Sequence, residues 1–216
     1  MTKLITKKLL SHLVVDLCGR DQHLRNVVDR LGPPPQWYRS PGFRTLLYLI
    51  LEQQISLASA RAAWGKLLST IGQTPTPENF LQLSDAELTI VGLSRQKVRY
   101  GRALAESVVV SYLQFDKLQS FDDKKIFEKL TSIVGIGRWT AEIYMLEAMR
   151  RPDIWPVTDL ALIIAVQEVF CLPERPNAEF LETLGEKWRP WRSVATRILW
   201  HHYLAGSKHG GGQKPK

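Results

Sequence analysis

The chain has 216 residues, of which 44% are hydrophobic and 23% charged, so it can form one large domain or two small ones with a real core. Its 29 basic and 21 acidic residues give a net charge of +8, which favours a polyanionic partner such as nucleic acid. Two cysteines, Cys18 and Cys171, are too few for a four-cysteine zinc or iron–sulfur site. No apolar run approaches the ~18 residues of a membrane span. We therefore expect a mostly reduced protein of the cytoplasm, or of the nucleus in a eukaryote.

Apolar residues recur at helical spacing along most of the chain, and no segment shows the sustained alternation of a strand. The predicted class is therefore all-α, with about ten helices joined by short connections. Helix boundaries are indicated by proline, glycine and asparagine at Gly32–Pro35, Ser40–Gly42, Thr74–Pro77, Asn177 and Pro190. Residues 206–216 contain three glycines in a row and three lysines, which predicts a disordered basic tail, a tag remnant being the alternative.

The most informative segment runs from Thr131 to Ala141, where two glycines one residue apart separate two helical patterns. Gly135 and Gly137 allow positive φ and close approach of the backbone. Backbone N–H groups at the start of the following helix then form a site for one DNA phosphate, beside the charge of Arg138. An ordinary glycine turn between two helices is the alternative. The segment Val91–Lys97 has a single glycine and is either a weaker DNA contact or a helix junction.

A lone acid follows in Pro156–Asp159. A carboxylate beside a deoxyribose stabilises the positive charge that develops when an N-glycosidic bond breaks, and it can orient the attacking water. Asp159 is therefore the candidate catalytic residue of an enzyme that acts on a nucleotide. The alternative is that Asp159, or Thr158, caps the helix that follows, and both roles can coexist.

Four segments in order resemble the helix-hairpin-helix DNA glycosylase superfamily and, within it, the 3-methyladenine DNA glycosylase II branch. Ile50–Ser56 resembles the loop that plugs the DNA stack, Gly135–Ala141 the hairpin, Pro156–Leu162 the catalytic-aspartate segment, and Trp188–Trp200 the C-terminal signature. The resemblance covers residues 36–204 and implies one glycosylase domain over 1–205 with two lobes and the active site in the cleft between them. Lobe A is expected at about 1–35 plus 149–205, and lobe B at about 36–148, ending in the hairpin 131–140.

The resemblance implies a DNA repair hydrolase that flips out an alkylated base, of the 3-methyladenine or 7-methylguanine type, and leaves an abasic site. Bifunctional relatives of endonuclease III carry a Schiff-base lysine where this chain has Trp139, so no lyase activity is expected. Damaged DNA is the expected partner, the protein is expected to be a monomer, and no cofactor is expected. Two other functions stay open: a glycosylase for uracil, mismatched or deaminated bases, and a DNA-binding module without catalysis.

The resemblance also assigns the site residues. An aromatic pocket for a cationic base is expected from Trp139, Trp200 and Tyr144, although Ile143 stands where the family often has an aromatic residue. Gln54, with Gln53 beside it, matches the wedge that fills the gap left by the flipped base, a surface amide being the alternative. The expected DNA-binding residues of the hairpin are Gly135, Ile136, Gly137, Arg138 and Thr140. Backbone carbonyls of Thr131, Ile133 and Ile136 match positions that hold a sodium or potassium ion in this fold, and no side-chain metal ligands are expected.

Overall fold

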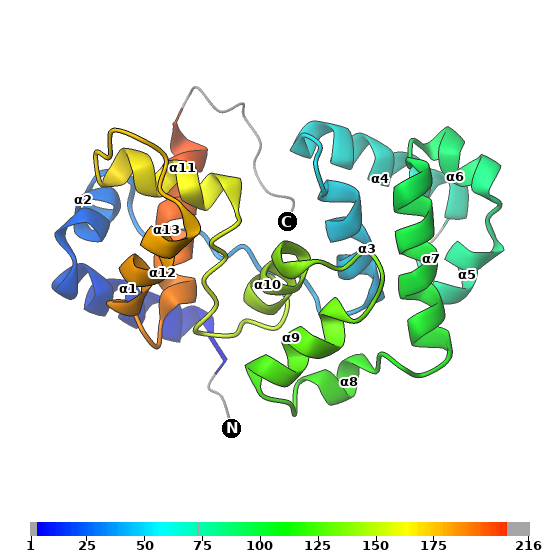
Figure 1. Cartoon of the computed structure of the whole chain (residues 1–216), viewed down its shortest axis with the longest axis horizontal. Coiled ribbons are helices and arrows are strands. Elements are labelled where there is room, and N and C mark those ends of the chain that lie inside the picture. The colour runs from blue at the N-terminus through cyan, green and yellow to red at the C-terminus, as the bar shows by residue number, and fades with distance from the viewer. Residues whose placement is uncertain (1–3, 73, 207–216) are drawn as a thin grey trace. The chain divides into compact units, whose positions relative to one another are not determined.

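The computed structural model describes residues 4–72 and 74–206, and these ranges contain thirteen α-helices and no β-strand (Figure 1). In chain order the helices are α1 (Lys7–Arg20), α2 (Gln22–Leu31), α3 (Phe43–Glu52), α4 (Leu57–Ile71), α5 (Pro77–Gln82), α6 (Asp85–Val91), α7 (Arg95–Val109), α8 (Phe115–Leu118), α9 (Asp123–Thr131), α10 (Arg138–Glu147), α11 (Leu160–Val169), α12 (Ala178–Glu186) and α13 (Arg192–Ala205). The predicted all-α class is confirmed. The helices beyond the expected ten are short, because α5, α6 and α8 have 6, 7 and 4 residues, too few to show a period in the sequence.

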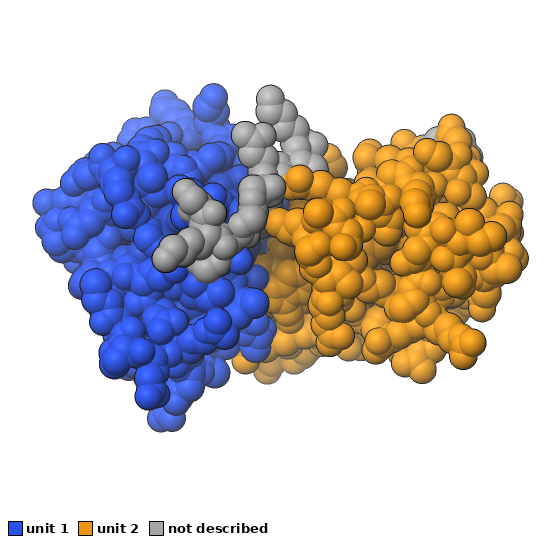
Figure 2. Space-filling view, turned by 90° about the horizontal axis from the view of Figure 1, so that it is seen from above, with its two compact units in different colours: residues 1–38, 145–216 blue, residues 39–144 orange. Residues whose placement is uncertain are grey.

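The chain divides into two compact units (Figure 2). Unit 1 comprises residues 1–38 and 145–216, with α1, α2, α11, α12 and α13, and unit 2 comprises residues 39–144, with α3 to α9. Helix α10 begins in unit 2 and ends in unit 1. The predicted basic tail lies, apart from Gly206, outside the described residues. No described helix is long and apolar enough to cross a membrane.

Side-chain caps explain where most of the helices begin. A Ser, Thr, Asp or Asn precedes nine of them and accepts a hydrogen bond from a backbone N–H of the first turn, and these residues are Thr6, Asp21, Ser56, Thr76, Ser84, Ser94, Asp122, Asp159 and Asn177. Each such cap stabilises its helix by about 1 kcal/mol relative to alanine. The boundary predicted at Asn177 is confirmed, and the proline-rich break before α5 ends with Pro77 in the first turn.

The core of unit 1 is built around two tryptophans. The rings of Trp155 and Trp188 meet edge to face with centroids 5.1 Å apart, and both side chains are buried. The indole N–H of Trp155 donates to the carbonyl of Leu181 at 2.7 Å, and that of Trp188 donates to the carboxylate of Asp21 at 3.1 Å. Each buried indole therefore has a partner for its only donor.

Asp21 joins three elements of unit 1. Its backbone N–H donates to the carbonyl of Leu17 at the end of α1. Its carboxylate caps α2 and pairs with the Lys187 ammonium at 2.6 Å. Burial acts to raise the pKa of Asp21, but the hydrogen bonds from Lys187, Leu24 and Trp188 outweigh it and hold that pKa below its usual range.

The core of unit 2 is organised by α3, where nine of ten residues are buried. Helix α3 packs on α4 and α7, and α7 in turn packs on α5. The close approach of α5 depends on Gly101 of α7, because a Cβ at that position would lie 2.6 Å from the ring of Phe80 and 3.2 Å from Leu47. The absence of a side chain at Gly101 is thus a packing requirement.

We expect Gly101→Ala to destabilise the protein by about 1–3 kcal/mol, because the added methyl overpacks the α5–α7 contact. The matched control is Gly65→Ala in α4, where a Cβ meets nothing within 4 Å. That change should stabilise by about 0.5–1 kcal/mol through helix propensity. Denaturant unfolding of the two variants measures the difference, and equal stabilities would contradict the role given to Gly101.

Candidate active site

Asp159 stands immediately before α11 and is buried, with 8% of its surface exposed. A turn places it there, since its backbone N–H donates to the carbonyl of Pro156 at 2.9 Å. Its Oδ1 accepts two hydrogen bonds of 2.8 Å, one from the backbone N–H of Leu162 and one from the indole Nε1 of Trp200. Asp159 therefore does cap α11, and the second bond fixes the carboxylate in a direction that capping alone does not require.

Trp200 brings a second helix, α13, into contact with Asp159. It lies on α13, is 2% exposed, and uses its only hydrogen-bond donor on the carboxylate. The ring of Trp37 meets it edge-on, with centroids 6.4 Å apart and planes at 64°. Unit 1 thus contains an acid with two tryptophans in series beside it. Sequence reasoning missed Trp37, which lies between the Gly32–Pro35 break and α3.

Arg197 is a buried support for Trp37, which contacts Trp200. Sequence reasoning missed it as well. Its side chain is completely buried, and it donates to the carbonyl of Trp37 at 3.2 Å and to that of Leu146 at 3.0 Å. Its guanidinium lies 4.8 Å from the ring centroid of Tyr38. Burial lowers the pKa of Arg197, and Tyr38 and Glu147 act in the opposite direction. The available signal was a lone arginine in the apolar run Val194–Trp200, at i, i+3 from Trp200 and so on the same helix face.

In unit 2 the predicted hairpin joins α9 to α10. Gly135 has φ of +93°, and a Cβ on it would lie 2.2 Å from the ring of Tyr100. Both the left-handed conformation and the ring beneath it therefore require glycine. Of the two glycines that allow positive φ, only Gly135 adopts it within this turn. Gly137 precedes α10 directly and accepts from the N–H of Ala141 as the first helical bond, a position that needs no left-handed φ.

The outer side of the hairpin is open. Gly137 and Arg138 are exposed, and a Cβ on Gly137 would meet no atom within 4 Å. Val134 at the turn is 55% exposed. Helix α10 begins at Arg138, so the positive end of its dipole lies at this open backbone. Arg138 also pairs with Glu142 at 2.8 Å.

The other predicted hairpin residues are engaged inside the protein. Ile136 is buried, and its N–H closes the turn on the carbonyl of Ile133 at 3.0 Å. Thr140 is 1% exposed, and Trp139 is half-buried. Tyr144 is buried as well, and its hydroxyl accepts from the N–H of Gly42 at 2.9 Å, while burial raises its pKa.

Gln53 links the α3–α4 loop to the hairpin. Its amide nitrogen donates to the carbonyl of Gly135 and to the hydroxyl of Thr140, both at 2.9 Å. Gln54, the next residue, is exposed and has φ of +56°. A non-glycine residue in this conformation is uncommon, and Ser111, Arg150 and Cys171 share it in this chain. The structure thus places Gln53 as a brace and Gln54 at the exposed tip of the loop.

Two further contacts anchor the end of α3, from which this loop starts. Lys97 donates its ammonium to the carbonyl of Leu51 at 2.6 Å, and partial burial lowers the pKa of Lys97. Arg39 donates to both carboxylate oxygens of Glu52, at 3.0 and 3.1 Å. Lys97 belongs to the Val91–Lys97 segment, which forms a helix junction between α6 and α7. The loop that carries Gln54 is therefore held at its base by side chains from three separate segments.

Metal sites built from side chains are absent from the described part of the chain, where no three His, Cys, Asp or Glu residues cluster. The predicted alkali-ion position would use backbone carbonyls in place of side chains. Thr131 ends α9, and the carbonyls at a helix C-terminus lack intrahelical donors. Ile133 uses its carbonyl once, for Ile136. The oxygen-only donor set of Thr131, Ile133 and Ile136 fits a hard monovalent cation.

Comparison with known proteins identifies the family of the chain. The family model described as "HhH-GPD superfamily base excision DNA repair protein" matches residues 47–190. DNA-3-methyladenine glycosylase 1 of Schizosaccharomyces pombe is 25% identical over 88% of this chain and 86% of that protein. The putative DNA-3-methyladenine glycosylase YfjP of Bacillus subtilis is 25% identical over 73% of this chain, which spans 58% of that protein.

A solved structure is similar over nearly the same range. The 3-methyladenine DNA glycosylase of Schizosaccharomyces pombe in complex with abasic DNA has a TM-score of 0.82 and 25% identity, covering 88% of this chain and 95% of that chain. The superfamily expected from the four sequence segments is confirmed, since its model matches well over half of the chain. This chain belongs to the HhH-GPD superfamily of base excision DNA repair proteins.

Proposed function

We propose that this protein is a DNA-3-methyladenine glycosylase that hydrolyses the N-glycosidic bond of alkylated bases in DNA and leaves an abasic site. The observation that carries the proposal is Asp159, whose carboxylate is fixed by Trp200 and by the first turn of α11. It occurs in a chain whose relatives are named DNA-3-methyladenine glycosylases, one of them with a structure bound to abasic DNA.

The proposed chemistry uses Asp159 as the only charged catalytic group. The bond between C1′ and the base nitrogen breaks, its electron pair leaves with the base, and positive charge develops on the deoxyribose. The carboxylate of Asp159 stabilises that charge and orients a water molecule, which adds to C1′ and gives up a proton to solvent. A base that carries a positive charge from alkylation departs as a neutral molecule, so no second acid is needed to protonate it.

Recognition of the base is assigned to aromatic faces. A cationic purine is attracted to an indole face by about 0.5–2 kcal/mol per contact. We propose Trp139, which is half-buried, as a stacking side chain. Trp200 is 2% exposed and donates to Asp159, so we assign it, with Trp37 against it, the support of that carboxylate. Tyr144 is buried and its hydroxyl accepts from Gly42, so we assign it no contact with the base.

DNA binding is assigned to the hairpin and to the α3–α4 loop. The open backbone at Gly137 and the start of α10 accept one phosphate, and Arg138 adds positive charge. The carbonyls of Thr131, Ile133 and Ile136 would hold an alkali ion, which supplies further positive charge beside that phosphate. Gln54 is proposed to fill the stack where the base has left, since it is the exposed residue of a loop held at its base.

Asp159→Asn should reduce release of alkylated bases by at least about 100-fold, because the variant loses the charge that stabilises the sugar cation. The side-chain oxygen of asparagine still accepts from Leu162 and Trp200, so the cap of α11 is kept. Chromatography of bases released from methylated DNA measures the effect, with binding to abasic duplex as the control. Full activity of Asp159→Asn would reduce Asp159 to a helix cap.

The same release assay on uracil-containing and mismatched DNA separates the proposed specificity from that of a glycosylase for neutral bases. We expect release of 3-methyladenine and 7-methylguanine and no release of uracil. A protein that binds abasic DNA and releases no base at all would be a binding module, and the catalytic proposal would fail.

We further propose that base removal occurs without strand cleavage. Helix α10 contains no lysine, and Trp139 stands in its first turn, so the helix offers no amine for a Schiff base with the sugar. Borohydride reduction during the reaction should therefore trap no covalent protein–DNA adduct, whereas a lyase run in parallel should give one. A trapped adduct would contradict the assignment.

Gly137→Ala should leave stability within about 0.5 kcal/mol of the parent, since the new methyl group enters open space. It should weaken DNA binding about tenfold, because the methyl group displaces the phosphate and costs roughly one hydrogen bond of about 1.4 kcal/mol. Gly135→Ala is the contrasting variant, expected to lose about 2–4 kcal/mol of stability from its left-handed φ and the contact with Tyr100. Unchanged DNA affinity of a folded Gly137→Ala protein would remove the hairpin from the interface.

A further inference from the structure

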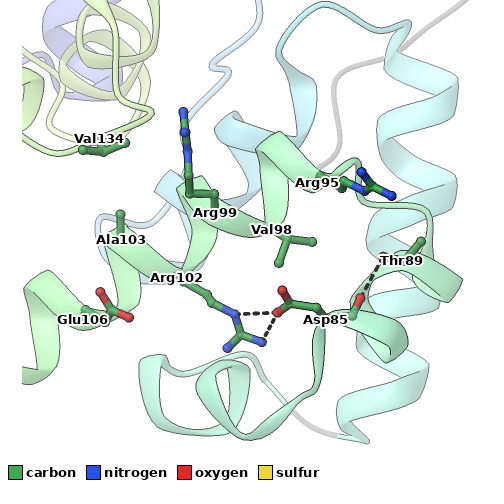
Figure 3. Close-up of a pocket in the computed structure, with 9 residues that line it drawn as sticks. All are labelled: Asp85, Thr89, Arg95, Val98, Arg99, Arg102, Ala103, Glu106 and Val134. Atoms are coloured by element: carbon green, nitrogen blue, oxygen red, sulfur yellow. Dashed lines mark hydrogen bonds and ion pairs between the residues drawn. The ribbon is translucent and has the colours of Figure 1, made fainter.

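A groove of about 690 Å³ lies on unit 2 beside the hairpin and is lined by residues of α6, α7 and the hairpin turn (Figure 3). Helix α7 contributes Arg95, Arg99 and Arg102, and the turn contributes Val134. None of these arginines takes part in the contacts assigned above to the hairpin or the α3–α4 loop. The groove is therefore a surface that the proposed function has not yet used.

The three arginines of the groove differ in how far their guanidinium groups are bonded within the protein. Arg102 is fully engaged, since its guanidinium donates to Asp85 at 2.5 and 2.9 Å and to the carbonyls of Leu81 and Leu83. Arg95 and Arg99 are exposed, and neither forms an ion pair with a carboxylate among the residues the structure describes. Figure 3 shows Arg99 extended away from the Arg102–Asp85 pair. With Glu106 as the remaining acid, the lining carries three positive and two negative charges.

Arg95 puts a positive charge at the N-terminus of α7, where the helix dipole disfavours it. It is the first residue of α7, and Lys97 follows two positions later, while no acid occurs in this first turn. Positive side chains at the positive end of the helix dipole are unfavourable unless an anion lies nearby. Arg99 is one turn further along the same helix, so the two guanidinium groups can each meet a separate anionic group.

The position of these arginines relative to the hairpin is fixed. Tyr100 follows Arg99 directly and fills the space beside Gly135 that a side chain would need. The amide of Gln96 donates to the hydroxyl of Tyr100 at 2.6 Å, and the guanidinium of Arg99 lies 5.4 Å from the centroid of the same ring. The arginine face of α7 and the phosphate-binding turn are thus packed through one ring within unit 2.

We infer that the groove binds the DNA backbone next to the phosphate held by the hairpin, with Arg95 and Arg99 each contacting one further phosphate. The inference rests on the proposed function for its choice of polyanion, and the chain's net charge of +8 agrees with that choice. Arginine binds phosphate through two parallel N–H donors, and the contacts carry no base sequence information. The groove thus extends the protein's footprint on duplex DNA beyond the damaged nucleotide.

The test is the salt dependence of DNA binding by Arg95→Gln/Arg99→Gln. Each lost phosphate contact reduces the slope of log affinity against log salt by about 0.9, so the double variant should lower the slope by about 1.8. Binding to a fluorescent duplex with an abasic-site analogue, at four or more salt concentrations, measures it. With progressively shorter flanks on the duplex, the magnitude of the parent's slope should fall by the same amount, about 1.8, and the slope of the variant should stay unchanged.

The matched control is Lys117→Gln/Lys124→Gln, which removes the same charge from exposed lysines of α8 and α9 that line neither the groove nor the hairpin turn. Thermal melting checks that all proteins are folded. A slope for Arg95→Gln/Arg99→Gln equal to that of the parent or of the lysine control overturns the inference.

Base release under single-turnover conditions with saturating protein separates this inference from the proposed function. There the double arginine variant should cleave methylated DNA at the parent rate, because its defect is in binding. A parent protein that binds DNA but releases no alkylated base would refute the glycosylase proposal, and the salt dependence of its DNA binding would still test the groove. Base release by the parent together with an unchanged salt slope would refute the groove alone.

Discussion

The hydrogen bond from the indole of Trp200 to the carboxylate of Asp159 is the interaction on which the candidate site of unit 1 depends. It joins residues 41 positions apart and connects the start of α11 to the buried face of α13. A carboxylate that merely capped a helix would take its second partner from water. Here a partner is a side chain that is 2% exposed and has a single donor, so the carboxylate is oriented by a buried group. Arg197 supports this arrangement in turn. It donates to the backbone carbonyl of Trp37, and the ring of Trp37 contacts the ring of Trp200.

Unit 2 follows a different plan, in which side chains hold the backbone of the turn and part of that backbone is left exposed. Tyr100 lies under Gly135, Gln53 bonds the carbonyl of Gly135, and Lys97 bonds the last turn of α3. The surfaces left open are main chain at Gly137 and a strained loop residue, Gln54. Recognition through main-chain N–H groups suits a phosphate, which is the same next to every base.

The features that sequence reasoning predicted well are local ones. The helical class, the cap at Asn177 and the hairpin between two helices follow from residues a few positions apart. Asp159 was expected to be either a cap or a catalytic group, and the structure shows the cap while the catalytic role stays a prediction. Both hairpin glycines allow positive φ, but only Gly135 adopts it, and at Gly137 the missing side chain leaves open space beside the backbone.

The features that were missed join distant parts of the chain. Arg197 and Trp37 are 160 residues apart, and Gln53 and Thr140 are 87 apart. No spacing rule pairs such residues, because their contact is created by the packing of whole helices. Gln53 shows the limit well: its position beside the wedge suggested a DNA contact, but its amide turns inward to the hairpin.

That inward amide has a mechanical consequence. Gln53 bonds both the turn at Gly135 and the hydroxyl of Thr140, so the residue that precedes Gln54 is tied to the hairpin by two hydrogen bonds. Under the proposed function, the side chain that fills the stack and the backbone that holds a phosphate would therefore be mechanically linked, and a shift of one would be passed to the other.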